Sequence, residues 1–173
     1  FVATPERATK LIAAAKARSE VSIEAWVKPA NSTQSSACIV SLSAADHYRS
    51  FALGQEGESY QACLRTSGTD HYGTAATLKA GKVTKSALAH LVYTRSASGT
   101  SRLFLNGLPV GERKVAGDFA NWNIAYRLGL GNEVAGDQPW HGELHLVAPP
   151  FAARVSADRT SAWLAGPLET FPV

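Results

Sequence analysis

The strict alternation of apolar and polar residues from Val21 to Val27 restricts this segment to an extended strand with one buried face. Apolar residues occupy every second position, and Ser, Glu and Trp stand between them. Successive side chains of a strand point to opposite faces of its sheet, so a two-residue period is typical of a strand that lies on a core. Pro29 is expected to end the strand, because proline cannot donate a ladder hydrogen bond.

Short strand-like runs continue along most of the chain. They are Cys38–Ser43, Ser50–Gln55, Tyr60–Thr66, His90–Arg95, Arg102–Leu105, Pro109–Lys114, Tyr126–Leu130 and Glu143–Val147. Turn-forming residues separate them, and Asn106-Gly107 is the strongest hairpin signal because both residues tolerate a positive φ. No helix of amphipathic length lies between the strands, which argues against a parallel α/β sheet. The pattern predicts an all-β fold, either an antiparallel β-sandwich or a barrel.

Two short helices are predicted, one near each end of the chain. From Thr4 to Arg18 apolar residues recur at helical spacing, with Thr4 as the expected N-cap and Pro5 in the first turn. A second helical stretch runs from Ser156 to Ala165, and the Gly-Pro pair that follows it stops the helix. We interpret residues 1–173 as a single domain, because this length suits one core and no repeat or linker interrupts it.

The distribution of charge argues against two kinds of partner. The chain has 17 Lys and Arg and 14 Asp and Glu, which are interspersed, whereas nucleic-acid binders gather basic residues on one face or arm. No segment approaches the roughly 20 apolar residues that span a bilayer. We therefore expect neither a nucleic-acid partner nor membrane insertion. The chain opens at Phe1 without a charged and then apolar leader, so a signal peptide or preceding domain is expected to have been removed.

The two cysteines leave two alternatives open. Cys38 and Cys63 each lie in a strand-like run, which would allow one disulfide between neighbouring strands in an oxidising compartment. The other alternative is a pair of free, buried thiols. Their spacing, with no further cysteine in the chain, argues against a zinc site.

Six stretches, in their order along the chain, resemble the laminin G-like jelly rolls of the concanavalin A-like superfamily, in the form found in bacteria. They are residues 21–29, 39–43, 51–55, 90–95, 102–107 and 140–148, beginning with VSIEAWVKP and ending with WHGELHLVA. The resemblance implies two packed antiparallel sheets in jelly-roll order, with a short helix after the last strand. It also implies that any ligand is held by loops at one rim or on the concave face. Residues 149–152 depart from the family, in which the strand more often continues into a turn.

The resemblance carries expectations about setting and ligands as well. Such domains are modules of larger surface or exported proteins, so we expect an extracytoplasmic location (secreted, periplasmic or cell-surface) within a multidomain chain. Members of the family bind glycans, proteins or calcium, and some are spacers. The fold alone therefore assigns no ligand.

Signals of catalysis are weak. Glycoside hydrolases on this fold need carboxylates on alternate residues of one strand, about 5 to 10 Å apart, and the Glu-Gly-Glu at residues 56–58 falls in an expected turn. A Gly-x-Ser-x-Gly elbow is absent from the sequence. We expect no enzymatic activity, and a sandwich-fold polysaccharide hydrolase or lyase is kept as an alternative.

A further pattern combines two histidines and a carboxylate. His141, Glu143 and His145 alternate along one expected strand, and such groups bind zinc or iron. Same-face neighbours on a strand lie roughly 6.6 Å apart, so the outer pair would have to lean inward to share one ion. A polar sheet face is therefore the preferred interpretation.

A calcium site is the stronger metal hypothesis. Carboxylate and amide side chains crowd two glycine-containing loops, and hard cations prefer such oxygen ligands. The candidate ligands are Asp118, Asn121, Asn132, Glu133 and Asp137. The alternative is ordinary turn chemistry, in which Asn and Asp side chains hydrogen-bond their own backbone.

Glycan binding calls for aromatic platforms beside planar hydrogen-bonding groups, because a sugar has an apolar face and a rim of hydroxyls. The candidates beside the same loops are Trp122, Tyr126, Arg127 and Trp140. Burial of the aromatic rings in the core is the alternative.

These expectations combine into one functional hypothesis. The domain is predicted to be a non-catalytic recognition or adhesion module for a glycan or a surface protein, with the loops from Ala116 to Trp140 as its contact surface. A structural spacer without a ligand is the alternative.

Overall fold

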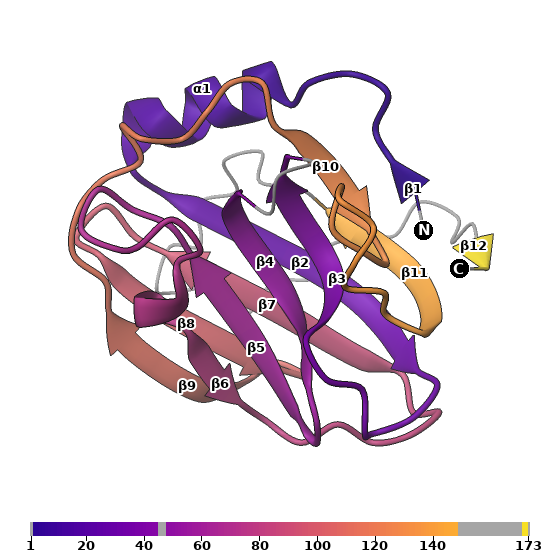
Figure 1. The fold of residues 1–173 in the computed structure, drawn as a ribbon. Helices are drawn as coiled ribbons and strands as arrows, with labels where there is room; N and C mark the ends of the chain where they lie inside the picture. The colour runs from indigo at the N-terminus through magenta and orange to yellow at the C-terminus, as the bar shows by residue number, and fades with distance from the viewer. Residues whose placement is uncertain (1, 45–47, 149–170, 173) are drawn as a thin grey trace.

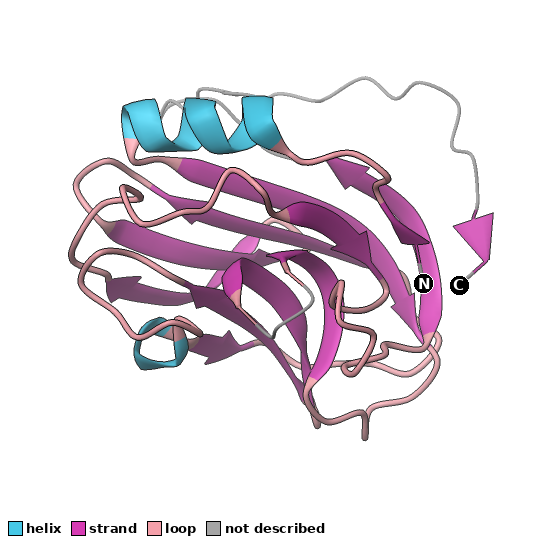
Figure 2. Cartoon of the chain, turned by 45° about the horizontal axis from the view of Figure 1, so that its top comes forward, coloured by secondary structure: helices cyan, strands magenta, loops and turns pink. Residues whose placement is uncertain are grey.

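The fold is a sandwich of two antiparallel sheets, as the alternation of apolar residues predicts. The computed structural model describes residues 2–44, 48–148 and 171–172. In Figures 1 and 2 the two sheets stack face to face, and a helix, α1 (Thr9–Arg18), lies across one end of the stack. The predicted fold class, an all-β jelly-roll sandwich, is confirmed.

Each sheet has six strands in the described residues. Sheet A has the order β1 (Val2–Ala3), β10 (Arg127–Leu130), β3 (Ala37–Ser43), β4 (Arg49–Glu56), β5 (Ser59–Leu64) and β6 (Leu78–Ala80). Sheet B has the order β12 (Phe171–Pro172), β11 (Gly142–Ala148), β2 (Val21–Pro29), β7 (Ala89–Arg95), β8 (Thr100–Leu105) and β9 (Leu108–Lys114). Neighbouring strands in both sheets pair antiparallel.

The core lies between the inner faces of the sheets. The four apolar residues of the alternating segment in β2 are all 4% exposed or less. Leu91 and Tyr93 of β7 and Phe51 and Leu53 of β4 complete the centre of the core. Burial of this much apolar surface is the main stabilising contribution to folding.

The helix α1 begins later than the sequence predicts. Thr4 is not its N-cap, because it extends the pairing of β1 with β10. Its backbone N–H donates to the Leu128 carbonyl oxygen, and its hydroxyl oxygen accepts the Leu128 N–H. The helix begins at Thr9 and buries Ile12 and Ala15 against the core. The pairing of Thr4 with a strand therefore overrides its local preference for a helix cap.

Other differences lie in short elements and at strand ends. The strand β6 and the 3-10 helix η1 (Thr74–Ala76) are too short to leave a periodic pattern. β11 has a bulge between Leu144 and Leu146, and His141 lies just before the strand. Glu143 and His145 still meet, with Glu143 Oε2 3.3 Å from His145 Nε2. The predicted helix Ser156–Ala165 lies outside the described residues.

The two cysteines are free and buried. Cys38 is on β3 and Cys63 on β5, with β4 between them. Strands are spaced about 4.8 Å apart, so residues two strands apart exceed the Cα separation of about 7 Å that a disulfide tolerates. Of the two alternatives for these thiols, the structure has the free pair.

A buried arginine joins the end of α1 to the loop after β9. The Arg95 guanidinium donates hydrogen bonds to the carbonyl oxygens of Ser19, Val115 and Gly117. Its Cζ atom lies 4.9 Å from the centre of the Phe119 ring. One planar group therefore satisfies three carbonyls that would otherwise lack donors.

Replacing Arg95 with lysine tests this role. An ammonium group cannot reach the three carbonyls together, so Arg95→Lys is expected to lower the free energy of unfolding by about 1 to 3 kcal/mol, measured by urea denaturation. The control is Arg102→Lys, at an exposed pair with Glu112, where the loss is expected to stay below about 1 kcal/mol. Equal losses in the two variants would contradict the assignment.

Candidate functional site

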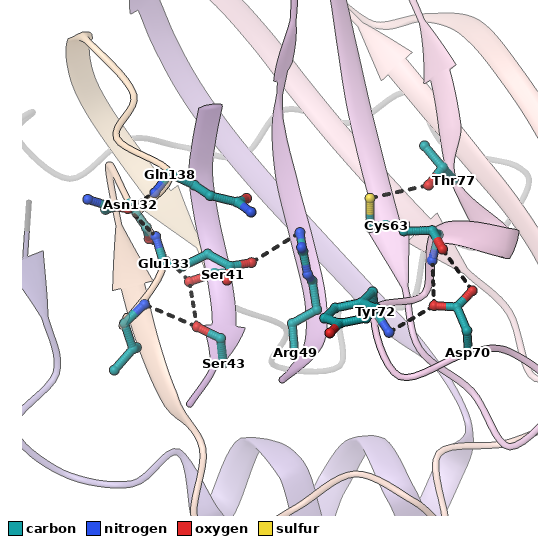
Figure 3. A network of polar contacts seen from close by, with 12 residues as sticks. Ser41, Ser43, Arg49, Cys63, Asp70, Tyr72, Thr77, Asn132, Glu133 and Gln138 are labelled. Atoms are coloured by element: carbon teal, nitrogen blue, oxygen red, sulfur yellow. Dashed lines mark hydrogen bonds and ion pairs between the residues drawn. The ribbon is translucent and has the colours of Figure 1, made fainter. Parts of the chain in front are cut away.

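The face of sheet A that points away from the core is itself largely covered. Cys38, Ala52 and Cys63 form a separate buried cluster on this outer face. Two segments flank them, the Glu133 loop (residues 131–141) and the Tyr72 segment (residues 65–77), and Figure 3 shows their polar contacts. This outer face is the candidate site because it gathers buried polar groups beside exposed aromatic rings.

The Glu133 loop is held on β3 by hydroxyl groups. Ser41 donates from Oγ to the Asn132 carbonyl oxygen at 3.2 Å, and the Val134 N–H donates to Ser43 Oγ at 3.2 Å. A Cβ on Gly129 of β10 would lie 2.8 Å from the Asn132 carbonyl oxygen. The missing side chain at Gly129 therefore lets the loop approach the sheet at this point.

The conformation of the loop is stabilised from within. Asn132 is 5% exposed, and its Oδ1 accepts the N–H groups of Glu133 and Gln138, each at 2.8 Å. Cys38 donates its N–H to the Gln138 carbonyl oxygen. This buried amide fixes the direction in which Glu133 points.

The central contact is an ion pair between Glu133 and Arg49. Glu133 Oε1 lies 3.1 Å from Arg49 Nη1, and the side chains are 0% and 12% exposed. Figure 3 shows the two side chains reaching toward each other across β3 and β4. Because each charge loses water on burial, each one depends on the other for compensation.

The Tyr72 segment is shaped by Asp70. The Asp70 carboxylate accepts the backbone N–H groups of Tyr72, Thr74 and Ala75 and the Thr74 hydroxyl, at 2.8 to 3.1 Å. Burial opposes ionisation, but these hydrogen bonds outweigh it and hold the pKa of Asp70 well below its usual range. A Cβ on Gly73 would lie 2.4 Å from the backbone of β5, so the segment packs closely on the sheet.

Exposed aromatic rings stand beside the ion pair. Tyr48 and Tyr72 are 43% and 42% exposed. The His71 ring lies edge-on to both, with centroid distances of 5.9 Å to Tyr48 and 6.3 Å to Tyr72. Arg49 Cζ lies 6.0 Å from the Tyr72 ring centre, within the range of a cation–π contact. We call these three rings the aromatic rim.

The thiols on this face are not reactive groups. Burial, reinforced by the nearby Glu133 carboxylate, raises the pKa of the Cys38 thiol. Burial also raises the pKa of Cys63, whose Sγ lies 3.3 Å from the Thr77 hydroxyl. Both remain protonated at neutral pH, and a thiol is a poor nucleophile and metal ligand.

The aromatic residues expected to contact a glycan lie in the core. Trp122 and Trp140 are each 2% exposed and Tyr126 is 5% exposed. The Trp122 indole N–H donates to a carbonyl oxygen of the Tyr72 segment, and that of Trp140 donates to Gln55. Burial, the alternative stated above, describes these rings better than a platform for a ligand.

Arg127, the fourth expected glycan contact, has a different position. It is half-buried at the start of β10, and its register partner is Ser43 of β3. Because cross-strand partners share a face, Arg127 lies on the outer face of sheet A, in line with Ser43.

The five expected calcium ligands fall into two groups. Asp118 and Asn121 are joined to the Tyr72 segment. The Asp118 N–H donates to Ser67 Oγ, and Asn121 Nδ2 donates to the Thr66 carbonyl oxygen, each at 2.9 Å. Asn132, Glu133 and Asp137 lie on the Glu133 loop. Within the part of the chain that the structure describes, no group of three or more His, Cys, Asp or Glu side chains is placed to hold a metal ion. Calcium binding stays a prediction.

The sequence reasoning missed the aromatic rim and Arg49. A signal was present in residues 70–73, Asp-His-Tyr-Gly, where a capping carboxylate and a flexible glycine enclose two aromatic residues. Aromatic residues inside a turn cannot reach a core as those in strands do, so they are expected to be exposed.

Replacing Asp70 with asparagine tests how the Tyr72 segment is held. An amide accepts through one oxygen only, so Asp70→Asn is expected to cost about 1 kcal/mol and lower Tm by about 2 to 4 °C. Because its folded pKa is depressed, the stabilising effect of Asp70 is present above the pKa of the unfolded chain and is lost as pH falls through the folded value. The difference in Tm between the two proteins should therefore shrink in strong acid, and a difference that is independent of pH would contradict this role.

The chain was compared with known proteins in sequence and in structure. A laminin G family model, described as the concanavalin A-like lectin/glucanases superfamily, matches residues 6–148. A search of curated protein sequences returned no match. In the described residues no helix is both long and apolar enough to cross a membrane.

Solved structures share the fold at low sequence identity. The CBM40 domain of the Ruminococcus gnavus IT-sialidase aligns with a TM-score of 0.57 and 18% identity, covering 82% of this chain and 83% of that one. The same domain bound to α2,3-sialyllactose aligns with a TM-score of 0.55 and 19% identity, covering 75% and 74%. A heptameric SAP-like pentraxin from Limulus polyphemus aligns with a TM-score of 0.54 and 13% identity over 75% of this chain, which spans only 63% of the pentraxin chain. With the family model matched over most of its length, the chain belongs to the concanavalin A-like lectin/glucanases superfamily.

Proposed function

We propose that this domain recognises a saccharide on the outer face of sheet A, with the aromatic rim as its contact surface. The observation that carries the proposal is the gathering of Tyr48, His71 and Tyr72 beside the fixed guanidinium of Arg49. A sugar ring offers an apolar face to an aromatic ring and hydroxyls to a planar donor. This part of the sheet provides both kinds of group.

The structural relatives are consistent with this proposal. One of them, the CBM40 domain, was solved with sialyllactose bound. Its fold likeness to this chain, at 19% identity, shows no shared ligand, because one fold hosts many functions. The proposal therefore depends on the side chains of the outer face.

The carboxylates of this face favour recognition over catalysis. A glycosidase needs one carboxyl group to act as acid and another as base or nucleophile. Glu133 is paired with Arg49, and Asp70 accepts four hydrogen bonds. Groups bound in this way are unsuited to proton transfer or nucleophilic attack, so a hydrolase or lyase is the less favoured reading.

A depression on another part of the molecule is a weaker candidate. It has a volume of about 340 Å³ at the end of sheet B and is lined by Lys28, Ser86, His141, Glu143 and their neighbours. Lys28 and Glu143 neutralise each other across 2.9 Å. Among the described residues that line it there is no Trp, Tyr or Phe, so these residues offer no platform for a sugar ring.

The setting of the domain is part of the proposal. We place it as a recognition or adhesion module of a larger exported protein, outside the cytoplasm, with a glycan of a cell or matrix surface as its partner. A spacer without a ligand is the competing hypothesis, and it gives no reason for exposed aromatic rings to gather beside a buried ion pair.

Replacing Tyr72 with alanine tests the saccharide proposal. Loss of one stacking ring is expected to weaken binding about tenfold, which corresponds to about 1.4 kcal/mol. The measurement is a glycan array followed by calorimetric titration of the best ligand. Tyr72→Phe keeps the ring and is expected to retain most of the affinity.

The matched control is Leu108→Ala, because Leu108 is 69% exposed on β9 of the other sheet. It is expected to leave affinity unchanged. Binding that survives Tyr48→Ala combined with Tyr72→Ala, or no binding to any saccharide, would refute the proposal.

Calcium binding is a separate proposal with its own test. An ion that binds only the native state raises Tm by mass action. Thermal melting with calcium and with EDTA is therefore expected to differ if the predicted ligands, Asp118, Asn121, Asn132, Glu133 and Asp137, hold the ion. Identical melting curves would remove the calcium hypothesis.

A further inference from the structure

We infer that the saccharide recognised by this face carries an acidic group, a carboxylate or a sulfate, that binds beside a row of arginines crossing sheet A. This inference rests on the proposed function and names the chemical class of its ligand. It is drawn from the positions of three arginines, Arg49, Arg65 and Arg127, and from which of them have a carboxylate partner.

The sheet register places these arginines in one row. Arg127 of β10 pairs with Ser43 of β3, and Ser43 pairs with Arg49 of β4 beyond a register shift. On the far side of β4, Arg65 donates its backbone N–H to the Ser50 carbonyl oxygen at 2.9 Å. Cross-strand partners share a face, so Arg127 and Arg49 lie on the outer side of the sheet with Ser43 between them. Arg65 directly follows β5 and lies beside Ser50, the neighbour of Arg49.

The described carboxylates leave much of this positive charge uncompensated. Glu133 neutralises Arg49 at 3.1 Å, and Asp70 is taken up by backbone and hydroxyl donors. The described residues place no carboxylate within ion-pair distance of Arg65 or Arg127. Among the described residues, two of the three guanidinium groups therefore have no carboxylate as counter-charge.

Polar atoms without partners mark the same place. Arg49 Nε, Arg65 Nε and Ser50 Oγ are each shielded from solvent and have no hydrogen-bond partner in the described residues. Buried donors are normally satisfied, and a cluster that is not satisfied indicates a missing acceptor or counter-charge. An anion bound beside these arginines would supply the negative counter-charge. Its attraction to the guanidinium groups would be stronger here than in water, because the partly buried surroundings have a lower dielectric constant.

Arg127 is the residue best placed to meet that anion directly. It is half-buried, and no hydrogen bond or ion pair joins its side chain to the described residues. A guanidinium binds carboxylate or sulfate through two parallel N–H groups. The aromatic rim lies on the same face of the sheet. Arg127 would therefore bind the acidic group of a ligand, and the aromatic rim would bind its sugar ring.

The test compares matched acidic and neutral saccharides on the intact domain. The probes are a uronate oligosaccharide with its carboxyl-reduced form, and a sulfated oligosaccharide with its desulfated form. The domain is expected to bind at least one acidic form about tenfold or more tightly than its neutral counterpart at about 50 mM NaCl, and this ratio should fall at about 500 mM NaCl. The two pairs distinguish carboxylate from sulfate.

Arg127→Gln assigns the preference to the row. This variant is expected to reduce the ratio of acidic to neutral binding to about threefold or less while binding to the neutral form stays unchanged. The control Arg18→Gln, on the exposed last turn of α1, should retain the full ratio. Unchanged Tm values in both variants would show that neither effect comes from unfolding.

The outcomes separate the two proposals. If acidic and neutral forms bind equally and Tyr72→Ala weakens both, the saccharide proposal stands and the inference of an acidic ligand is wrong. A preference for acidic forms that survives Arg127→Gln also overturns it. Absence of binding to every saccharide overturns both.

Discussion

The buried ion pair between Glu133 and Arg49 is the contact on which the organisation of the outer face depends. A carboxylate that is 0% exposed loses several kcal/mol of hydration, and this loss is tolerable only beside a well-placed cation. The cation comes from β4, and the carboxylate comes from a loop that follows β10. Ser41, Ser43 and Asn132 hold that loop in the position that brings the charges together. A polar network of this kind fixes one arrangement of the loop, because partly satisfied alternatives leave charge buried without compensation.

The two sheets of the sandwich consequently differ in role. Sheet B carries large side chains on its outer face, such as Trp26, whose ring stacks on that of His90 with 4.4 Å between the ring centroids. Sheet A carries small residues on the equivalent face, with Cys38, Ala52 and Cys63 as its floor. Small side chains leave room for loops to fold onto the sheet and for exposed rings to gather at their edge. The fold thus supplies a floor of small buried residues, and under the proposed function the loops supply the groups that a ligand would meet.

Much of the fold could be predicted from the sequence, because strand periodicity is a local property. The alternation in β2 is reproduced residue by residue, with Val21, Ile23, Ala25 and Val27 buried. The candidate site was harder to predict because its residues come from segments far apart in the chain, such as Arg49 and Glu133. Their register is set by the order of strands in sheet A, which single-sequence patterns do not reveal. Trp122 and Trp140 were the conspicuous aromatic residues near polar loops, but their indole N–H groups have internal partners and their rings fill the core.

The most direct test of this account is an NMR titration of the labelled domain with a bound saccharide. The account predicts that amide shifts concentrate at Tyr48, Arg49, Tyr72 and residues 131–134, which belong to the outer face of sheet A. Shifts concentrated at Trp26, His90 and Phe104 would place the ligand on sheet B and contradict it.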